Sequence, residues 1–213
     1  MEIIKSILQR LYPLGIFRAG KAVYLTFDDG PIPEVTPKVL AILDHYHIKA
    51  TFFMVGENID KHPEVFEQVV AAGHTIGNHT YNHLKGWNYS LQEYMANVQQ
   101  WEEAVHHTPY TIHHTLSTIH HTPLFRPPYG KATLRQRIAL HQRGYQIIYW
   151  DVLTQDYNPT KTPENMLAKI QRQVRPGSII NFHDSLKSNE RMLTVLPQAI
   201  EWLMAQGYEI KSL

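Results

Sequence analysis

A short apolar run near the start of the chain ends in two carboxylates and a turn: Val23-Tyr-Leu-Thr-Phe-Asp-Asp-Gly-Pro31. β-Branched and aromatic residues favour a strand, and Gly and Pro end one, so the run predicts a strand at 23–27 followed by a polar turn. The same combination of an apolar run and a polar ending recurs along the chain. The predicted strands lie at 23–27, 50–55, 75–76, 124–125, 146–152, 178–182 and 208–210.

Segments with helical spacing of their apolar residues lie between these strands. Ser90 and Glu93 have the spacing of a capping box, and Thr36 and Thr162, each followed by proline, are typical of a helix start. The first predicted helix begins at residue 36. The others cover 63–72, 90–105, 133–143, 162–174 and 190–205. Strands that alternate with helices indicate parallel βα units, so we expect an α/β fold of about seven parallel strands, with polar strand ends at one edge.

The composition excludes several classes of function. The chain has 213 residues, with 20 Lys and Arg against 19 Asp and Glu, for a formal net charge of +1. This balance gives no field that favours nucleic acid or an anionic membrane as the main partner. The absence of cysteine excludes a disulfide framework, a Cys-ligated zinc site and thiol catalysis. The length fits one α/β domain, assigned to residues 1–213 with a motif core at 22–210.

The first 20 residues predict an amphipathic helix, because charged and polar residues interrupt their apolar positions. They contain no unbroken apolar run with a small-residue cleavage site, so no signal peptide is predicted. No apolar stretch in the sequence reaches the length of a membrane span. The cytoplasm is therefore the default location.

A tandem repeat of seven residues occupies 106–122 and contains six of the 14 histidines. It reads His106-His-Thr-Pro-Tyr-Thr-Ile112, then His-His-Thr-Leu-Ser-Thr-Ile119, then His-His-Thr122. The period is much shorter than that of folds built from stacked repeats. We interpret the segment as an expanded surface connection, and an accessory metal-binding tract is the alternative.

Two histidines and two carboxylates have the spacing of a metal site. His79 and His83 are four residues apart, which on a helix or tight turn places both imidazoles on one face. Two His and one Asp are a common ligand set for Zn²⁺ or another divalent ion, with positions left for water and substrate. Of the adjacent pair Asp28 and Asp29, one carboxylate can then bind metal and the other can act as a base.

Five segments together resemble the motifs of the polysaccharide deacetylase family, the NodB homology domain of carbohydrate esterase family 4. The match rests on their residue types and on their order along the chain. The segments are Thr26-Phe-Asp-Asp-Gly-Pro31, His79-Thr-Tyr-Asn-His83, Arg126-Pro-Pro-Tyr-Gly130, Trp150 to Tyr157, and Ile180-Asn-Phe-His-Asp184. The resemblance implies a distorted (β/α) barrel of about seven parallel strands.

The resemblance also implies a role for each matching residue. Asp29, His79 and His83 are expected to bind one divalent metal ion, with Zn²⁺ first and Co²⁺ or Ni²⁺ as alternatives. Asp28 is expected to be the general base, and Arg126 to hold its carboxylate.

The other half of the implied mechanism concerns the leaving group. His183 is expected to be the general acid, because an amine must be protonated before it departs. Asp156 is expected to orient His183, and the backbone N–H of Tyr129 to face the oxyanion. The implied reaction is metal-dependent removal of N-acetyl groups from the amino sugars of a glycan. Substrates of the family lie mostly outside the cytoplasm, so association with the cell envelope stays open.

The sequence departs from the family pattern in its fourth and fifth motifs. Leu153 stands where Asp is usual and Tyr157 where Trp is usual, so the shape of the acyl pocket is open. Hydrolysis of another acyl group or of a small non-sugar amide is therefore an alternative, and a non-catalytic glycan-binding domain is a further one. Asn181 is a polar residue on a strand expected to be buried on both faces, for which the sequence suggests only a local hydrogen bond.

The remaining candidates receive structural interpretations. Asp151 either lines the cleft or supports the fold, Asp184 caps or braces its loop, and His74 is structural. Four further histidines are expected on the surface of helices: His45, His47, His62 and His141. The sequence does not indicate an oligomeric state or which glycan is bound.

Overall fold

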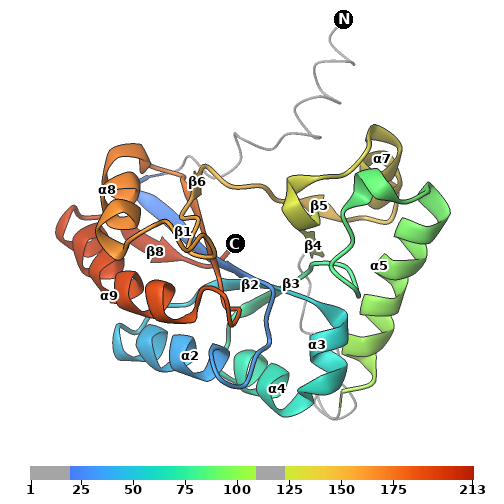
Figure 1. Ribbon diagram of the computed structural model, residues 1–213, viewed down its shortest axis with the longest axis horizontal. Coiled ribbons are helices and arrows are strands. Elements are labelled where there is room, and N and C mark those ends of the chain that lie inside the picture. The colour runs from blue at the N-terminus through green and yellow to red at the C-terminus, as the bar shows by residue number, and fades with distance from the viewer. Residues whose placement is uncertain (1–19, 109–122) are drawn as a thin grey trace, which may run out of the picture.

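The computed structural model describes residues 20–108 and 123–213 (Figure 1). The helix predicted in the first 20 residues and most of the histidine-rich repeat lie outside these ranges. Among the described residues, no helix combines the length and the apolar character that crossing a bilayer requires.

One sheet contains all the described strands, and the neighbouring strands in it are parallel. Its order is β5-β4-β3-β2-β1-β7-β6, and β8 pairs with the start of β1. The sheet curls into a half-barrel with helices outside it, which confirms the expected distorted (β/α) barrel (Figure 1). The strands are β1 (Ala22–Asp28), β2 (Thr51–Met54), β3 (Thr75–Asn78), β4 (Leu124–Phe125), β5 (Gln146–Ile147), β6 (Val152–Leu153), β7 (Ile179–His183) and β8 (Glu209–Lys211).

Strand β1 lies at the centre of the sheet, and all seven of its residues are buried. Its aromatic residue Phe27 stacks on Phe52 of β2 and on Phe182 of β7, with ring centroids 5.0 and 5.7 Å apart. The register of β1 and β7 pairs Asp28 with His183. The predicted acid and base are therefore neighbours across one strand spacing.

The helices cover the outside of the sheet and follow the sequence signals closely. Ser90 and Thr133 form capping boxes, and Thr162 caps the helix that Pro163 begins. The helices are α2 (Thr36–His45), α3 (Gly56–Lys61), α4 (Pro63–Ala71), α5 (Leu91–His106), α7 (Leu134–Gln142), α8 (Pro163–Gln173) and α9 (Asn189–Ala205), with 3₁₀ turns η1 (Gly86–Asn88) and η3 (Pro128–Gly130).

Two local predictions are wrong. The single strand predicted at 146–152 is divided into β5 and β6, because its two halves pair with β4 and with β7, at opposite ends of the sheet. Between the two halves, the buried side chain of Arg126 donates to the carbonyls of Ile148 and Tyr149. Thr36 does not cap α2 but is its first residue, after Val35. Its hydroxyl instead donates to Asp184, at 2.6 Å. In both places, a polar group that could have stabilised local secondary structure forms a hydrogen bond with a side chain that is distant in the sequence, either Arg126 or Asp184.

Candidate metal and proton-transfer site

The carboxyl ends of the strands bring the predicted residues together, as the sequence suggested. Asp28 and His183 are the last residues of β1 and β7. His79 directly follows β3, and Arg126 directly follows β4. Asp156 lies three residues beyond β6. Residues from five segments of the chain thus meet at one edge of the sheet.

Asp29, His79 and His83 form a cluster whose candidate ligand atoms all lie within 4.8 Å of one another. Oδ1 of Asp29 is 3.2 Å from Nε2 of His83 and 3.7 Å from Nε2 of His79. Nδ1 of His79 is 2.7 Å from the carbonyl oxygen of Arg126, which fixes the ring and leaves Nε2 for the cluster. The spacing of His79 and His83 therefore does bring both imidazoles to one carboxylate.

The donors in this cluster fit a divalent metal ion. Oδ1 of Asp29 is buried and has no hydrogen-bond partner within residues 20–108 and 123–213, and such orphaned oxygens are rare in proteins. Burial lowers the pKa of His79 to about 4, so this imidazole is neutral and can ligate. Burial opposes ionisation of Asp29, but the neighbouring imidazoles, His83 first, outweigh it and hold its pKa below the usual range.

The backbone around the cluster adopts conformations that only specific packing maintains. Asp29, Thr80 and His83 have positive φ angles of 86°, 61° and 54°. Non-glycine residues rarely adopt this region, and they cluster at functional sites when they do. Asn58 of α3 donates to the backbone oxygen of Asp29, at 2.7 Å. The short helix α3, which the sequence did not predict, thus supports the turn that carries Asp29.

Both oxygens of the Asp28 carboxylate accept a hydrogen bond. Nη1 of Arg126 donates to Oδ1 at 2.7 Å, and Nδ2 of Asn181 donates to Oδ2 at 2.9 Å. The Arg126 side chain is fully buried, and its guanidinium lies 4.1 Å from the centre of the Phe53 ring and 5.7 Å from that of Trp150. This planar cation between two rings fixes the orientation of the carboxylate.

Asn181 is a site residue whose role the sequence did not reveal. Its Oδ1 accepts from Nη1 of Arg126 at 2.7 Å and from the hydroxyl of Thr26 at 3.1 Å, while its Nδ2 contacts Asp28. The amide thus accepts from the arginine and donates to the carboxylate, which orders both partners. The available signal was a polar residue in the middle of a buried strand.

The imidazole of His183 forms an ion pair with Asp156. Nδ1 of His183 is 2.8 Å from Oδ1 of Asp156, and the backbone N–H of His183 donates to Oδ2, also at 2.8 Å. Burial disfavours the charged imidazolium, but the fully buried Asp156 outweighs burial and raises the pKa of His183 to about 9. Tyr157, the residue in place of the usual Trp, packs edge-on against His183, with ring centroids 4.9 Å apart.

Asp184 braces the turn after β1, which confirms one of the two interpretations of this residue. Its Oδ1 accepts from the backbone N–H of Gly30 at 3.0 Å, and its Oδ2 accepts from Thr36. A Cβ atom at Gly30 would overlap the Asp184 carboxyl group, so only glycine fits this position. Burial raises the pKa of Asp184 to about 8.

Three other candidates lie at the margin of the site or outside it. Tyr129 is exposed in η3 with a φ of 59°, and its ring centroid is 4.6 Å from that of His83. Asp151 pairs with Arg175 and accepts from the backbone N–H of Ile179, which assigns it to support of the fold. Nδ1 of buried His74 accepts from the backbone of residue 50, as expected for a structural histidine.

Comparisons with known proteins agree with the fold and with the sequence motifs. The sequence model described as polysaccharide deacetylase matches residues 18–148. A peptidoglycan-N-acetylglucosamine deacetylase of Bacillus cereus is 32% identical over 193 residues, which cover 88% of this chain and 84% of that protein. A chitooligosaccharide deacetylase of Azorhizobium caulinodans is 29% identical over 203 residues, or 90% of this chain and 92% of that protein.

Solved structures give the same result. A crystal structure of a peptidoglycan N-acetylglucosamine deacetylase in complex with 4-naphthalen-1-yl-N-oxidanyl-benzamide superposes on this chain with a TM-score of 0.83. The identity is 29%, and the match covers 92% of this chain and 87% of that one.

Proposed function

Because this chain belongs to the polysaccharide deacetylase family, we propose that it removes N-acetyl groups from the amino sugars of a glycan. The relatives named for peptidoglycan and for chitooligosaccharides support N-acetylglucosamine as the sugar. The observation that carries the proposal is one buried carboxylate, Asp28, held between Arg126 and Asn181 beside a cluster of metal-ligand type.

In the proposed enzyme Asp29, His79 and His83 hold one divalent cation, for which Zn²⁺ suits the nitrogen and oxygen donors. When bound, such a cation acidifies water and polarises an amide carbonyl. The neutral state of His79 supports this role, since a protonated imidazole cannot ligate.

Asp28 is the proposed general base and takes a proton from the attacking water. Arg126 and Asn181 hold its two oxygens, so the carboxylate is oriented before the substrate arrives. The backbone N–H of Tyr129, on an exposed turn against His83, is the proposed donor to the oxyanion.

His183 is the proposed general acid and gives its proton to the leaving amine. An acid must be charged to do so, and the pKa of about 9 keeps the imidazolium protonated at neutral pH. Asp156 is a positioning residue that holds both the ring and the backbone of His183. Asp28 and His183 then serve opposite proton transfers from neighbouring strands.

Acetate release from N-acetylglucosamine oligomers and from peptidoglycan tests the proposal, with bound metal measured on the same samples. We expect the wild type to bind metal and release acetate, and Asp28→Asn to keep the metal but lose at least about 100-fold in kcat. Asp44→Asn, a change of an exposed carboxylate on α2, is the matched control and should leave both properties unchanged.

Two results would contradict the proposal. Metal binding without acetate release from any of these glycans would exclude N-deacetylation of N-acetylglucosamine and favour the alternative acyl group or amide. An Asp28→Asn enzyme as fast as the wild type would show that the base is another residue.

A further inference from the structure

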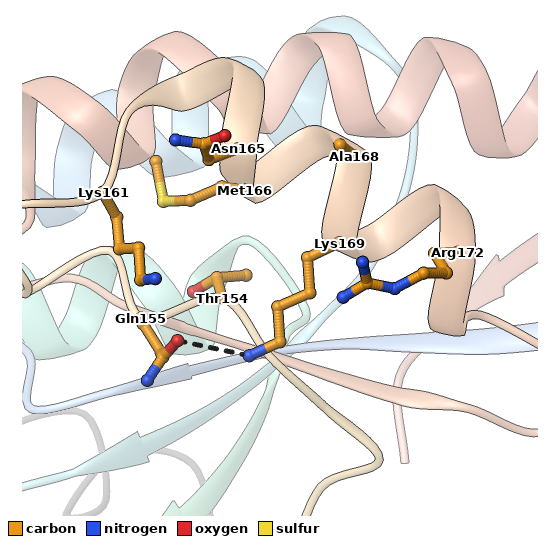
Figure 2. A pocket seen from close by; sticks show the side chains of 8 residues that line it. All are labelled: Thr154, Gln155, Lys161, Asn165, Met166, Ala168, Lys169 and Arg172. Carbon is orange, nitrogen blue, oxygen red and sulfur yellow. Dashed lines mark hydrogen bonds between the residues drawn. The ribbon is translucent and has the colours of Figure 1, made fainter.

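A basic pocket lies between α8 and the loop that follows β6 (Figure 2). Its volume is about 410 Å³, which is large enough for a carboxylate or phosphate group and part of the molecule that carries it. Eight residues line it, and three of them are the cations Lys161, Lys169 and Arg172. None of the eight is acidic.

The three cations face the pocket without a counter-charge. Figure 2 shows the side chains of Lys161 and Lys169 directed toward Gln155, with the Arg172 guanidinium beside Lys169. Within residues 20–108 and 123–213, none of the three cations forms a salt bridge. Partial burial and then repulsion from Lys161 and Arg172 lower the pKa of Lys169. A bound anion would relieve this repulsion.

The wall of the pocket includes the two residues that precede Asp156, the partner of the proposed acid. Gln155 lines the pocket and accepts from Nζ of Lys169 at 3.4 Å, and the next residue is Asp156, which holds His183. Thr154, also in the wall, donates to the backbone oxygen of Asn181 at 2.8 Å. The pocket wall and Asp156, the partner of the proposed acid, are therefore carried by the same loop after β6.

The sugar that carries the leaving amine must lie beside His183, the proposed acid. We propose that the basic pocket is an anion subsite, which binds a carboxylate or phosphate group carried by the glycan substrate near the acetylated sugar. The subsite rests on the proposed deacetylase function, and it selects acidic glycans over neutral ones of the same length. The side-chain amides of Gln155 and Asn165 offer further N–H donors in the pocket.

The test compares three substrates: a neutral N-acetylglucosamine oligomer, a glycan of similar length whose sugars carry carboxylates, and one that carries a phosphate monoester. Each is assayed with the wild type, with the double variant Lys169→Gln/Arg172→Gln, and with Lys38→Gln as a control on the exposed side of α2. In the double variant we expect KM to rise about tenfold for one acidic series, with kcat and the neutral substrate unchanged. The series that responds identifies the anion.

Direct binding keeps the test independent of activity. Titration of the metal-loaded protein with inorganic phosphate and with malonate should show affinity for at least one anion that falls about tenfold in the double variant and in Arg172→Gln alone, but not in Lys38→Gln. Equal anion affinity in wild type and variants, together with equal KM changes for neutral and acidic glycans, would overturn the subsite. A wild type that deacetylates no glycan while the anion titration still depends on Arg172 would contradict the proposed function instead.

Discussion

Replacing Asp156 by Asn tests whether the ion pair between Asp156 and His183 keeps His183, the proposed acid, protonated. The carboxylate lies 2.8 Å from Nδ1 of His183, and the pKa of His183 stands at about 9 against an ordinary 6.5. Asn removes the negative charge but keeps an oxygen that can accept the backbone N–H of His183. Burial, which disfavours the imidazolium, is then no longer outweighed by this partner, so the pKa should fall to about 6.5 or below.

The size of the effect follows from the fraction of His183 that is protonated. At pH 8 a group with a pKa of about 9 is about 90% protonated, whereas one at 6.5 is about 3% protonated. We therefore expect Asp156→Asn to lose about 30-fold in rate at pH 8 through protonation alone, and much less at pH 6. A cation bound beside Asp29, His79 and His83 would lower the pKa of His183 in both the wild type and the variant, so the difference between the two pKa values is the quantity to measure.

The assay is kcat/KM for acetate release from pH 5.5 to 10 in the wild type, Asp156→Asn and Asp151→Asn. Asp151 is the matched control, because it also accepts a backbone N–H in the sheet but contacts Arg175 instead of His183. The alkaline limb of the profile should move down by two or more pH units in Asp156→Asn only. An unmoved limb would refute the assignment of His183 as the acid that Asp156 tunes.

Unfolding gives a second measurement that does not depend on substrate. The folded-state pKa of His183 is raised, so its contribution to stability is fully present below pH 6.5 and is lost as pH rises through about 9. The raised pKa of His183 contributes about 3 kcal/mol at most to the free energy of unfolding. The free energy of unfolding of the wild type should therefore fall across this window more steeply than that of Asp156→Asn.

Three further perturbations test the rest of the site. Asn181→Leu leaves Oδ2 of Asp28 without a donor, so kcat should fall at least about tenfold and the unfolding free energy by about 1–3 kcal/mol. Asp29→Asn removes the charge of a proposed metal ligand, so bound metal measured by mass spectrometry should fall at least about tenfold, and a chelator should lower the unfolding temperature of the wild type only. Asp184→Asn removes a carboxyl whose pKa is raised to about 8, so stability lost by the wild type as pH rises from 4 to 8 should be retained in the variant.

Each of these expectations has a result that contradicts it. Full activity of Asn181→Leu would mean that Arg126 alone orients the base. Unchanged metal content in Asp29→Asn would place the ion elsewhere. Parallel stability curves for wild type and Asp184→Asn would show that the buried carboxyl titrates near its ordinary value.

Much of the fold could be predicted because its signals are local. The run that ends at Asp28 is apolar, central and buried throughout, and Ser90 with Glu93 forms the capping box that its spacing indicates. The break between β5 and β6 could not be predicted, since it depends on which distant strand each half pairs with, and the carbonyls between them are bound by Arg126 from another strand end. Periodicity carries no information about such a contact.

In the site, too, residues in local motifs could be predicted, whereas a residue that depends on distant partners could not. Asp29, His79 and His83 lie together as their motifs suggested. Asn181 is as important to the geometry, yet its partners are 55 and 153 positions away along the chain. A sequence indicates only that an amide on a buried strand needs hydrogen-bond partners, because burying it without them is costly. It does not indicate which residues those partners are.

The pairing of Asp28 with His183 across β1 and β7 has a consequence for how this scaffold can change. Hydrogen bonds between two central strands set the spacing of the proposed proton acceptor and the proposed proton donor, and neither residue depends on a long loop for its position. Connections elsewhere, such as the one that carries the seven-residue repeat, can lengthen or change composition without moving that pair. Substrate range can therefore diversify in the loops while the reaction geometry is inherited unchanged through the sheet.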